Sequence, residues 1–170
     1  MKNIVLLGFM GTGKTAVARK LAESTGRKYI SIDEMIVEKE KMPIKDIFSR
    51  KGEAYFRKIE KETVREVSAG EGLVIDTGGG VVMDSENMVL LSERGETVCL
   101  WASPEVIRER TSGHGHRPLL NVEDPERKIR ELLENRRPFY QKADIHIQTD
   151  GKSVNDVVET IKGRLMDEEE

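Results

Sequence analysis

Residues 8–15 read Gly-Phe-Met-Gly-Thr-Gly-Lys-Thr and constrain the fold of this 170-residue chain more than any other stretch. They match the pattern Gly-x4-Gly-Lys-Ser/Thr and directly follow the apolar run Ile4–Leu7. In a phosphate-binding loop (P-loop) of this kind, glycines let backbone N–H groups turn inward, and these donors form a cradle for a polyphosphate with the N-terminus of the next helix. A glycine-rich turn that binds nothing is the alternative, which the flanking strand and helix patterns disfavour.

The loop predicts a nucleotide-binding site with defined contacts. Lys14 is expected to reach the β- and γ-phosphates of ATP and so to act in catalysis, and the Thr15 hydroxyl is expected to ligate Mg²⁺. The expected ATP-binding residues of the loop are Gly11, Thr12, Gly13, Lys14, Thr15 and Ala16.

Composition excludes several other classes of function. Charged residues make up 35% of the chain with a net charge of −3, so no strong positive field is available to hold nucleic acid. No apolar stretch approaches the roughly 18 residues of a membrane span, and the N-terminus runs straight into a short strand. The single cysteine, Cys99, lies in an apolar run and is expected to be a buried thiol. We therefore expect a cytoplasmic monomer without membrane or nucleic-acid partners.

Short apolar runs alternate with amphipathic segments along the whole chain. This alternation is typical of an α/β fold in which helices cover both faces of a parallel sheet. The expected strands are residues 4–7, 28–32, 73–75, 97–101 and 144–148. The expected helices are 14–24, 33–42, 53–67, 85–92, 103–110, 125–142 and 153–165, with a short turn at 44–48.

Polar residues follow three of these strands at one edge of the expected sheet. Ligands of such sheets bind beyond the carboxyl ends of the strands, and the stretches after Leu7, Ile32 and Ile75 would meet there. Asp33 could bind an acceptor hydroxyl and take its proton, or it could simply be the N-cap of the next helix. The sequence thus indicates a site for two substrates.

Residues 111–118 have no apolar period and contain two glycines. They are expected to form a loop that continues to about residue 124, and loops of this length are usually functional or disordered. His114 and His116 could suggest a metal site, but no third ligand lies nearby in the sequence. His146 is expected to be structural.

Several motifs together resemble the shikimate kinase family. They are the P-loop, Ile47-Phe48-x3-Gly52-Glu53-x2-Phe56-Arg57-x2-Glu60, Thr77-Gly78-Gly79-Gly80, Arg117-Pro118-Leu119-Leu120 and Arg136-x-Pro138-x-Tyr140. The resemblance implies a P-loop kinase fold of the nucleoside monophosphate kinase type, with a five-stranded parallel sheet and a mobile lid. It also implies the ATP-dependent phosphorylation of shikimate at its 3-hydroxyl, with Mg²⁺ as cofactor.

The resemblance assigns roles residue by residue. It places shikimate against Asp33, Arg57, Gly78, Gly79, Gly80 and Arg136, and it makes Asp33 catalytic. Arg117 matches a catalytic lid arginine that also contacts ATP, and Arg110 matches the position that packs on adenine. Without the resemblance, Arg57 and Arg136 could be solvated surface residues, and Arg110 could be an exposed helix terminus. The implied organisation is one domain, 1–170, with a substrate-binding subregion at 33–62, a lid loop at 111–124 and an acidic tail at 167–170.

The chain departs from the family pattern at one expected metal position. The family usually has Asp-x-Asp after the second strand, whereas this chain has Ser31-Ile32-Asp33. The third strand instead ends in Asp76, as an apolar run closed by Asp does in many P-loop proteins. Our hypothesis is that Asp76 takes over the metal-supporting role of residue 31. The alternative is that Asp76 only caps the glycine turn.

Two other functions remain open at this stage. A related kinase could act on another polyol acid such as gluconate, although Arg57, Arg136 and the glycine triplet disfavour it. A nucleotide-binding regulatory protein without catalysis is conceivable because position 31 lacks Asp, although Lys14, Asp33 and Arg117 are all present.

Overall fold

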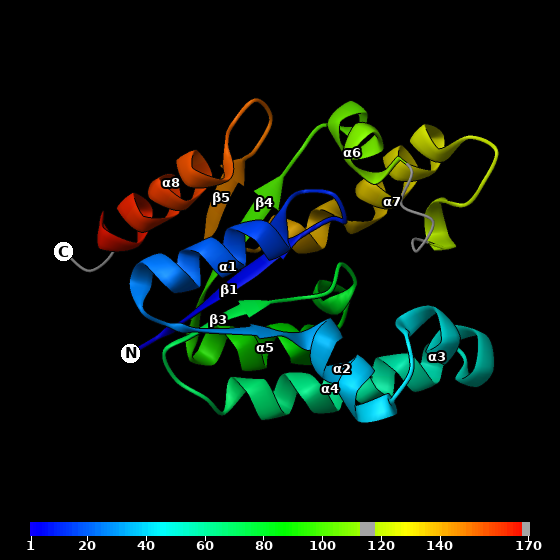
Figure 1. Ribbon diagram of the computed structural model, residues 1–170, viewed down its shortest axis with the longest axis horizontal. Helices are drawn as coiled ribbons and strands as arrows, with labels where there is room; N and C mark the ends of the chain where they lie inside the picture. Colours follow the sequence, from blue (N-terminus) through cyan, green and yellow to red (C-terminus); the bar gives the residue numbers. More distant parts are fainter. Residues whose placement is uncertain (113–117, 168–170) are drawn as a thin grey trace.

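The computed structural model describes residues 1–112 and 118–167. In this part of the chain, five parallel strands form one sheet in the order β2-β3-β1-β4-β5, with helices on both faces (Figure 1). The strands are β1 (Asn3–Gly8), β2 (Lys28–Ser31), β3 (Leu73–Asp76), β4 (Gly95–Trp101) and β5 (Ile145–Gln148). The expected five-stranded parallel sheet is therefore confirmed.

Helices connect the strands and cover the sheet. They are α1 (Lys14–Thr25), α2 (Ile32–Glu40), α3 (Ile44–Lys51), α4 (Glu53–Ser68), α5 (Ser85–Glu93), α6 (Pro104–Thr111), α7 (Pro125–Tyr140) and α8 (Val154–Asp167). Two short 3₁₀ turns, η1 (Val81–Met83) and η2 (Pro118–Leu120), complete the described elements. Within the described ranges no helix is both long and apolar enough to cross a membrane.

The central strand β1 is buried on both sides, which explains its continuous apolar sequence. Ile4 and Leu6 pack on the face covered by α1 and α8. Val5 and Leu7 point to the opposite face and pack in the core formed with α4, α5 and α7. Because side chains alternate along a strand, this one short run packs into the cores on both faces of the sheet. The packing fixes the position of the P-loop at the end of β1.

The boundaries of some elements differ from the expected ones. The second strand ends one residue early because Ser31 is the N-cap of α2, its hydroxyl accepting a hydrogen bond from the Glu34 N–H at 3.2 Å. The interpretation of Asp33 as the cap was therefore wrong. The fourth strand begins at Gly95, because β4 pairs with the full length of β1.

The expected loop at 111–124 is only partly described. Thr111 still belongs to α6, and η2 forms a turn within the expected loop range. Residues 113–117, with His114, His116 and Arg117, lie outside the described residues.

The only cysteine of the chain provides a test of the core. Cys99 is fully buried in β4, and burial raises the pKa of its thiol to about 12. Since the thiolate is the reactive form, we expect the native protein to react with Ellman's reagent at least about 100-fold more slowly than the unfolded chain. Unfolding in guanidinium chloride should release one thiol equivalent. Rapid reaction of the native protein would contradict this packing.

Candidate functional site

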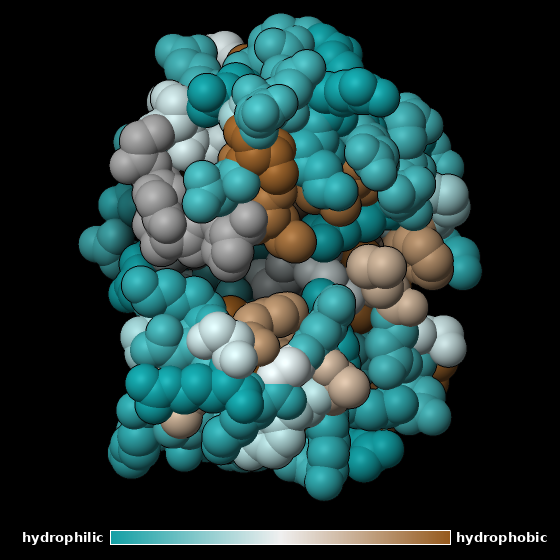
Figure 2. All heavy atoms as spheres, turned by 90° about the vertical axis from the view of Figure 1, so that its right-hand side faces the viewer, coloured by the Kyte–Doolittle hydropathy of each residue, from teal (hydrophilic) through white to brown (hydrophobic). Residues whose placement is uncertain are grey.

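A cavity of about 1070 Å³ opens at the carboxyl ends of β1, β2 and β3. Its walls come from the P-loop, the first turns of α1 and α2, residues 41–45 at the start of α3, the end of β3 with its glycine turn, and Arg110. Figure 2 views the molecule from this side and shows a hollow across the middle of the face. The expected meeting of the three strand ends is therefore observed.

The P-loop backbone has the geometry that its glycines allow. Gly13 precedes α1 with a φ of 90°, and no side chain caps this helix, so an anion can bind at its N-terminus. A Cβ at Gly8 would lie 2.6 Å from the Leu100 carbonyl oxygen, which excludes any larger residue there. The Thr12 hydroxyl donates to the Phe9 carbonyl at 2.7 Å and closes the loop.

Two charged or polar side chains of the P-loop lie on the cavity wall. The Lys14 ammonium donates to the carbonyl oxygens of Gly8 at 2.7 Å and Phe9 at 3.1 Å. The Thr15 hydroxyl donates to Oδ2 of Asp76 at 2.7 Å, although the two residues are 61 positions apart in the chain.

Asp76 is 5% exposed at the end of β3. The Tyr29 hydroxyl donates to the same Oδ2 at 3.3 Å, so the carboxylate is held from β2 and from α1. Burial raises the pKa of Asp76 above its ordinary value, and the positive charge of Lys14 opposes this shift. In the described part of the chain, its hydrogen-bond partners are Thr15 and Tyr29 rather than the glycine turn.

The Thr15–Asp76 pair offers oxygen groups that could hold a divalent cation. Mg²⁺ prefers oxygen ligands and usually takes one or two from the protein, while water and substrate phosphates supply the rest. A hydroxyl and a carboxylate beside the P-loop fit that pattern. The described residues contain no cluster of three or more His, Cys, Asp or Glu that could hold a metal by protein ligands alone.

Three side chains from three different helices converge on the glycine turn Gly78–Gly80. A Cβ on the first glycine would lie 2.9 Å from Oδ1 of Asp33, on the second 3.2 Å from Nη1 of Arg136, and on the third 2.6 Å from Nη1 of Arg57. The turn must therefore be free of side chains for these polar groups to lie where they do. The expected acceptor residues are brought together at one place.

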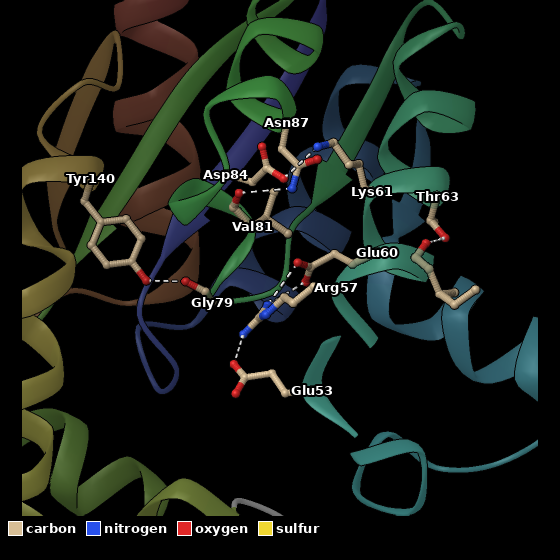
Figure 3. A network of polar contacts seen from close by, with 11 residues as sticks. Glu53, Arg57, Glu60, Lys61, Thr63, Gly79, Val81, Asp84, Asn87 and Tyr140 are labelled. Atoms are coloured by element: carbon tan, nitrogen blue, oxygen red, sulfur yellow. Dashed lines mark hydrogen bonds and ion pairs between the residues drawn. The ribbon is translucent and has the colours of Figure 1, made fainter. Parts of the chain in front are cut away.

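Arg57 is held in position by acidic residues of its own helix (Figure 3). Its Nη1 donates to both carboxylate oxygens of Glu60, at 2.9 and 3.2 Å, and Glu53 lies at 3.6 Å. Glu60 is only 2% exposed, and burial raises its pKa although Arg57 acts in the opposite direction. Glu60 has no role predicted from the sequence. The signal was present, because Glu60 follows Phe56 by four residues on the buried face of α4.

Arg136 is 6% exposed, so its interpretation as a solvated surface residue is wrong. Its guanidinium lies 5.4 Å from the centre of the Phe9 ring. One turn further along α7, the buried Tyr140 hydroxyl donates to the Gly79 carbonyl at 2.6 Å (Figure 3). Burial raises the pKa of Tyr140 to about 12, so the hydroxyl remains a donor at neutral pH.

Arg110 is half-buried at the rim of the cavity. Its Nη1 donates to the Gly11 carbonyl and to the Thr149 hydroxyl, both at 3.2 Å. These contacts argue against an exposed helix terminus without tertiary contacts. Arg110 thus joins α6 to the P-loop and to the segment after β5.

The fold and the site together define a P-loop kinase. A gluconokinase from Sinorhizobium meliloti shares the fold alone, with a TM-score of 0.57 and 19% identity over 93% of this chain and 87% of that one. The chain belongs to the shikimate kinase family, because the model of that family matches residues 10–166.

Individual relatives agree with this assignment. A shikimate kinase from Thermodesulfovibrio yellowstonii is 48% identical over 161 residues, which cover 95% of this chain and 93% of the relative. The solved structure of a shikimate kinase from Acinetobacter baumannii in complex with shikimate is 37% identical, with a TM-score of 0.95. That match covers 99% of this chain and 94% of the solved one.

The hydrogen bond between Tyr140 and Gly79 should stabilise the glycine turn. Replacing Tyr140 by Phe leaves the half-buried Gly79 carbonyl without this donor, and we expect the free energy of unfolding to fall by about 0.5–1.5 kcal/mol. Urea unfolding measures the change. Tyr55→Phe is the matched control, because the Tyr55 hydroxyl contacts Glu40 at a less buried position and should cost clearly less. Equal losses in both variants would contradict the role of Tyr140.

Proposed function

We propose that this protein transfers the γ-phosphoryl group of ATP to the 3-hydroxyl of shikimate and forms shikimate 3-phosphate, a step toward chorismate and the aromatic amino acids. The observation that carries the proposal is the convergence of Asp33, Arg57 and Arg136 on Gly78–Gly80, in the same sheet edge as the P-loop. Membership of the shikimate kinase family and the shikimate bound to the related Acinetobacter enzyme support it.

The P-loop side of the cavity is suited to the donor. Backbone N–H groups at the N-terminus of α1 and the Lys14 ammonium would bind the phosphates of ATP, and Arg110 would lie near the base. Thr15 would hold Mg²⁺, which when bound neutralises charge on the β- and γ-phosphates. Catalysis on this side requires positioning and charge neutralisation rather than covalent chemistry.

The glycine-turn side is suited to a small acid with hydroxyl groups. Two guanidiniums, from Arg57 and Arg136, can each donate parallel hydrogen bonds to a carboxylate. Asp33 would accept the proton of the attacking hydroxyl as the phosphoryl group is transferred. The glycine turn lets the ring of the acceptor approach the backbone closely.

Acceptor specificity can be tested directly. We expect a coupled assay of ADP release to show turnover with shikimate, and only background with gluconate or without an acceptor. Phosphorus NMR of the product should place the phosphate on the 3-hydroxyl. Turnover with gluconate alone would favour the related polyol-acid kinase, and no turnover with any acceptor would favour a nucleotide-binding regulatory protein.

The neighbouring arginines of α7 allow a matched comparison. Arg136→Lys keeps the charge but removes the planar fork, so we expect the KM for shikimate to rise about 10- to 100-fold. The KM for ATP should change less than about twofold, because Arg136 lies on the glycine-turn side. Arg137→Lys is the control, since that side chain is 45% exposed and pairs with Glu134.

Thermal unfolding of both variants would show that they fold. A similar KM for shikimate in the Arg136 and Arg137 variants would contradict the proposed carboxylate contact.

A further inference from the structure

Ser31 and Asp76 are neighbours at the carboxyl ends of β2 and β3, where the two residues are register partners. The Ser31 hydroxyl caps α2, because it accepts a hydrogen bond from the Glu34 N–H. The Asp76 carboxylate contacts the P-loop instead, because it accepts a hydrogen bond from the Thr15 hydroxyl. Of these two register partners, only the β3 residue carries a carboxylate, and it contacts the P-loop.

The sheet order brings β3 closer to the P-loop than β2. β3 pairs directly with β1, and Asp76 is the register partner of Leu6, two residues before the P-loop begins at Gly8. β2 is separated from β1 by β3. A carboxylate at residue 76 thus reaches the first turn of α1 from an adjacent strand.

The hydrogen bond orients the Thr15 hydroxyl. A threonine hydroxyl has one proton and two acceptor lone pairs. Since the proton of Thr15 is directed to Oδ2 of Asp76 at 2.7 Å, the lone pairs remain available to a cation in the cavity. Tyr29 donates to the same oxygen from β2 and so fixes the carboxylate. Partners of this kind, behind a direct ligand, orient the ligand and raise metal affinity.

The burial of Asp76 also favours a cation beside it. A carboxylate that is 5% exposed loses most of its hydration, and two hydroxyl donors compensate for only part of that loss. The nearby Lys14 contributes positive charge. A divalent cation bound at Thr15 would add further positive charge beside the Asp76 carboxylate.

We propose that Asp76 is the positioning residue of the magnesium–nucleotide site of this protein: it orients Thr15 and supplies, from β3, the negative charge that supports the metal. The inference rests on the proposed function only in that the nucleotide binds with Mg²⁺. It assigns the metal-supporting role to β3 and leaves Ser31 as the cap of α2.

The test measures how strongly Mg²⁺ and nucleotide binding are coupled. Calorimetry of the full chain gives the ADP affinity with excess Mg²⁺ and with EDTA, and the ratio of the two affinities is the coupling. In Asp76→Asn, which keeps the size and an acceptor for Thr15 but removes the charge, we expect this ratio to fall about tenfold or more. The ADP affinity in EDTA should change less than about threefold, because the P-loop donors remain.

A second variant covers a failure of the first to fold. Asp76→Ser is smaller, removes the charge and withdraws the acceptor from Thr15. The same loss of coupling is expected. Glu34→Gln is the control, because this exposed carboxylate also lines the cavity but pairs with Arg19. Its coupling should match that of the wild type.

Wild-type coupling in either folded Asp76 variant would overturn the proposal, and so would an equal loss of ADP affinity with and without Mg²⁺. The measurement uses no acceptor. A protein that phosphorylates an acid other than shikimate would therefore refute the proposed function and still show the coupling expected for Asp76.

Discussion

The parallel pairing of β1 with β3 is the interaction on which the site depends. β1 carries the P-loop at its end, and β3 carries Asp76 and the glycine turn at the same edge. Because parallel strands run in one direction, their carboxyl ends meet, and segments more than 60 residues apart become neighbours. The buried alternation of β1, with Ile4 and Leu6 on one face and Val5 and Leu7 on the other, stabilises this pairing from both cores.

Three cationic side chains lie at the P-loop and the glycine turn. Lys14 lines the cavity at the P-loop, and Arg57 and Arg136 lie beside the glycine turn. Each of these cations has an acceptor or an aromatic ring close by. Glu60 is the clearest example of a supporting residue. Its buried carboxylate accepts two hydrogen bonds from Arg57 and so fixes that guanidinium, and Glu60 is not among the residues of the cavity wall. Desolvated charges of this kind are stable only when they are paired. Each buried charge therefore requires a particular partner residue, as Glu60 requires Arg57.

Where the sequence left two interpretations open, local rules allowed both. Ser31 and Asp33 are both good N-cap residues, and the register of β2 on β3 selected Ser31 by ending the strand there. Arg136 and Arg137 are adjacent and chemically identical, so no periodicity argument separates them with certainty. The rotation of α7 against the sheet buries the first and exposes the second.

The sequence alone was enough to establish the P-loop, the parallel sheet and the family resemblance, because glycine spacing and apolar periodicity act over a few residues and need no knowledge of distant contacts. The tertiary structure decided which polar groups share a partner. The contact of Thr15 with Asp76, the support of Arg57 by a buried Glu60 and the approach of three helices to Gly78–Gly80 all depend on how distant elements pack. Packing angles and strand register are collective properties of the whole core, and no short stretch of sequence encodes them.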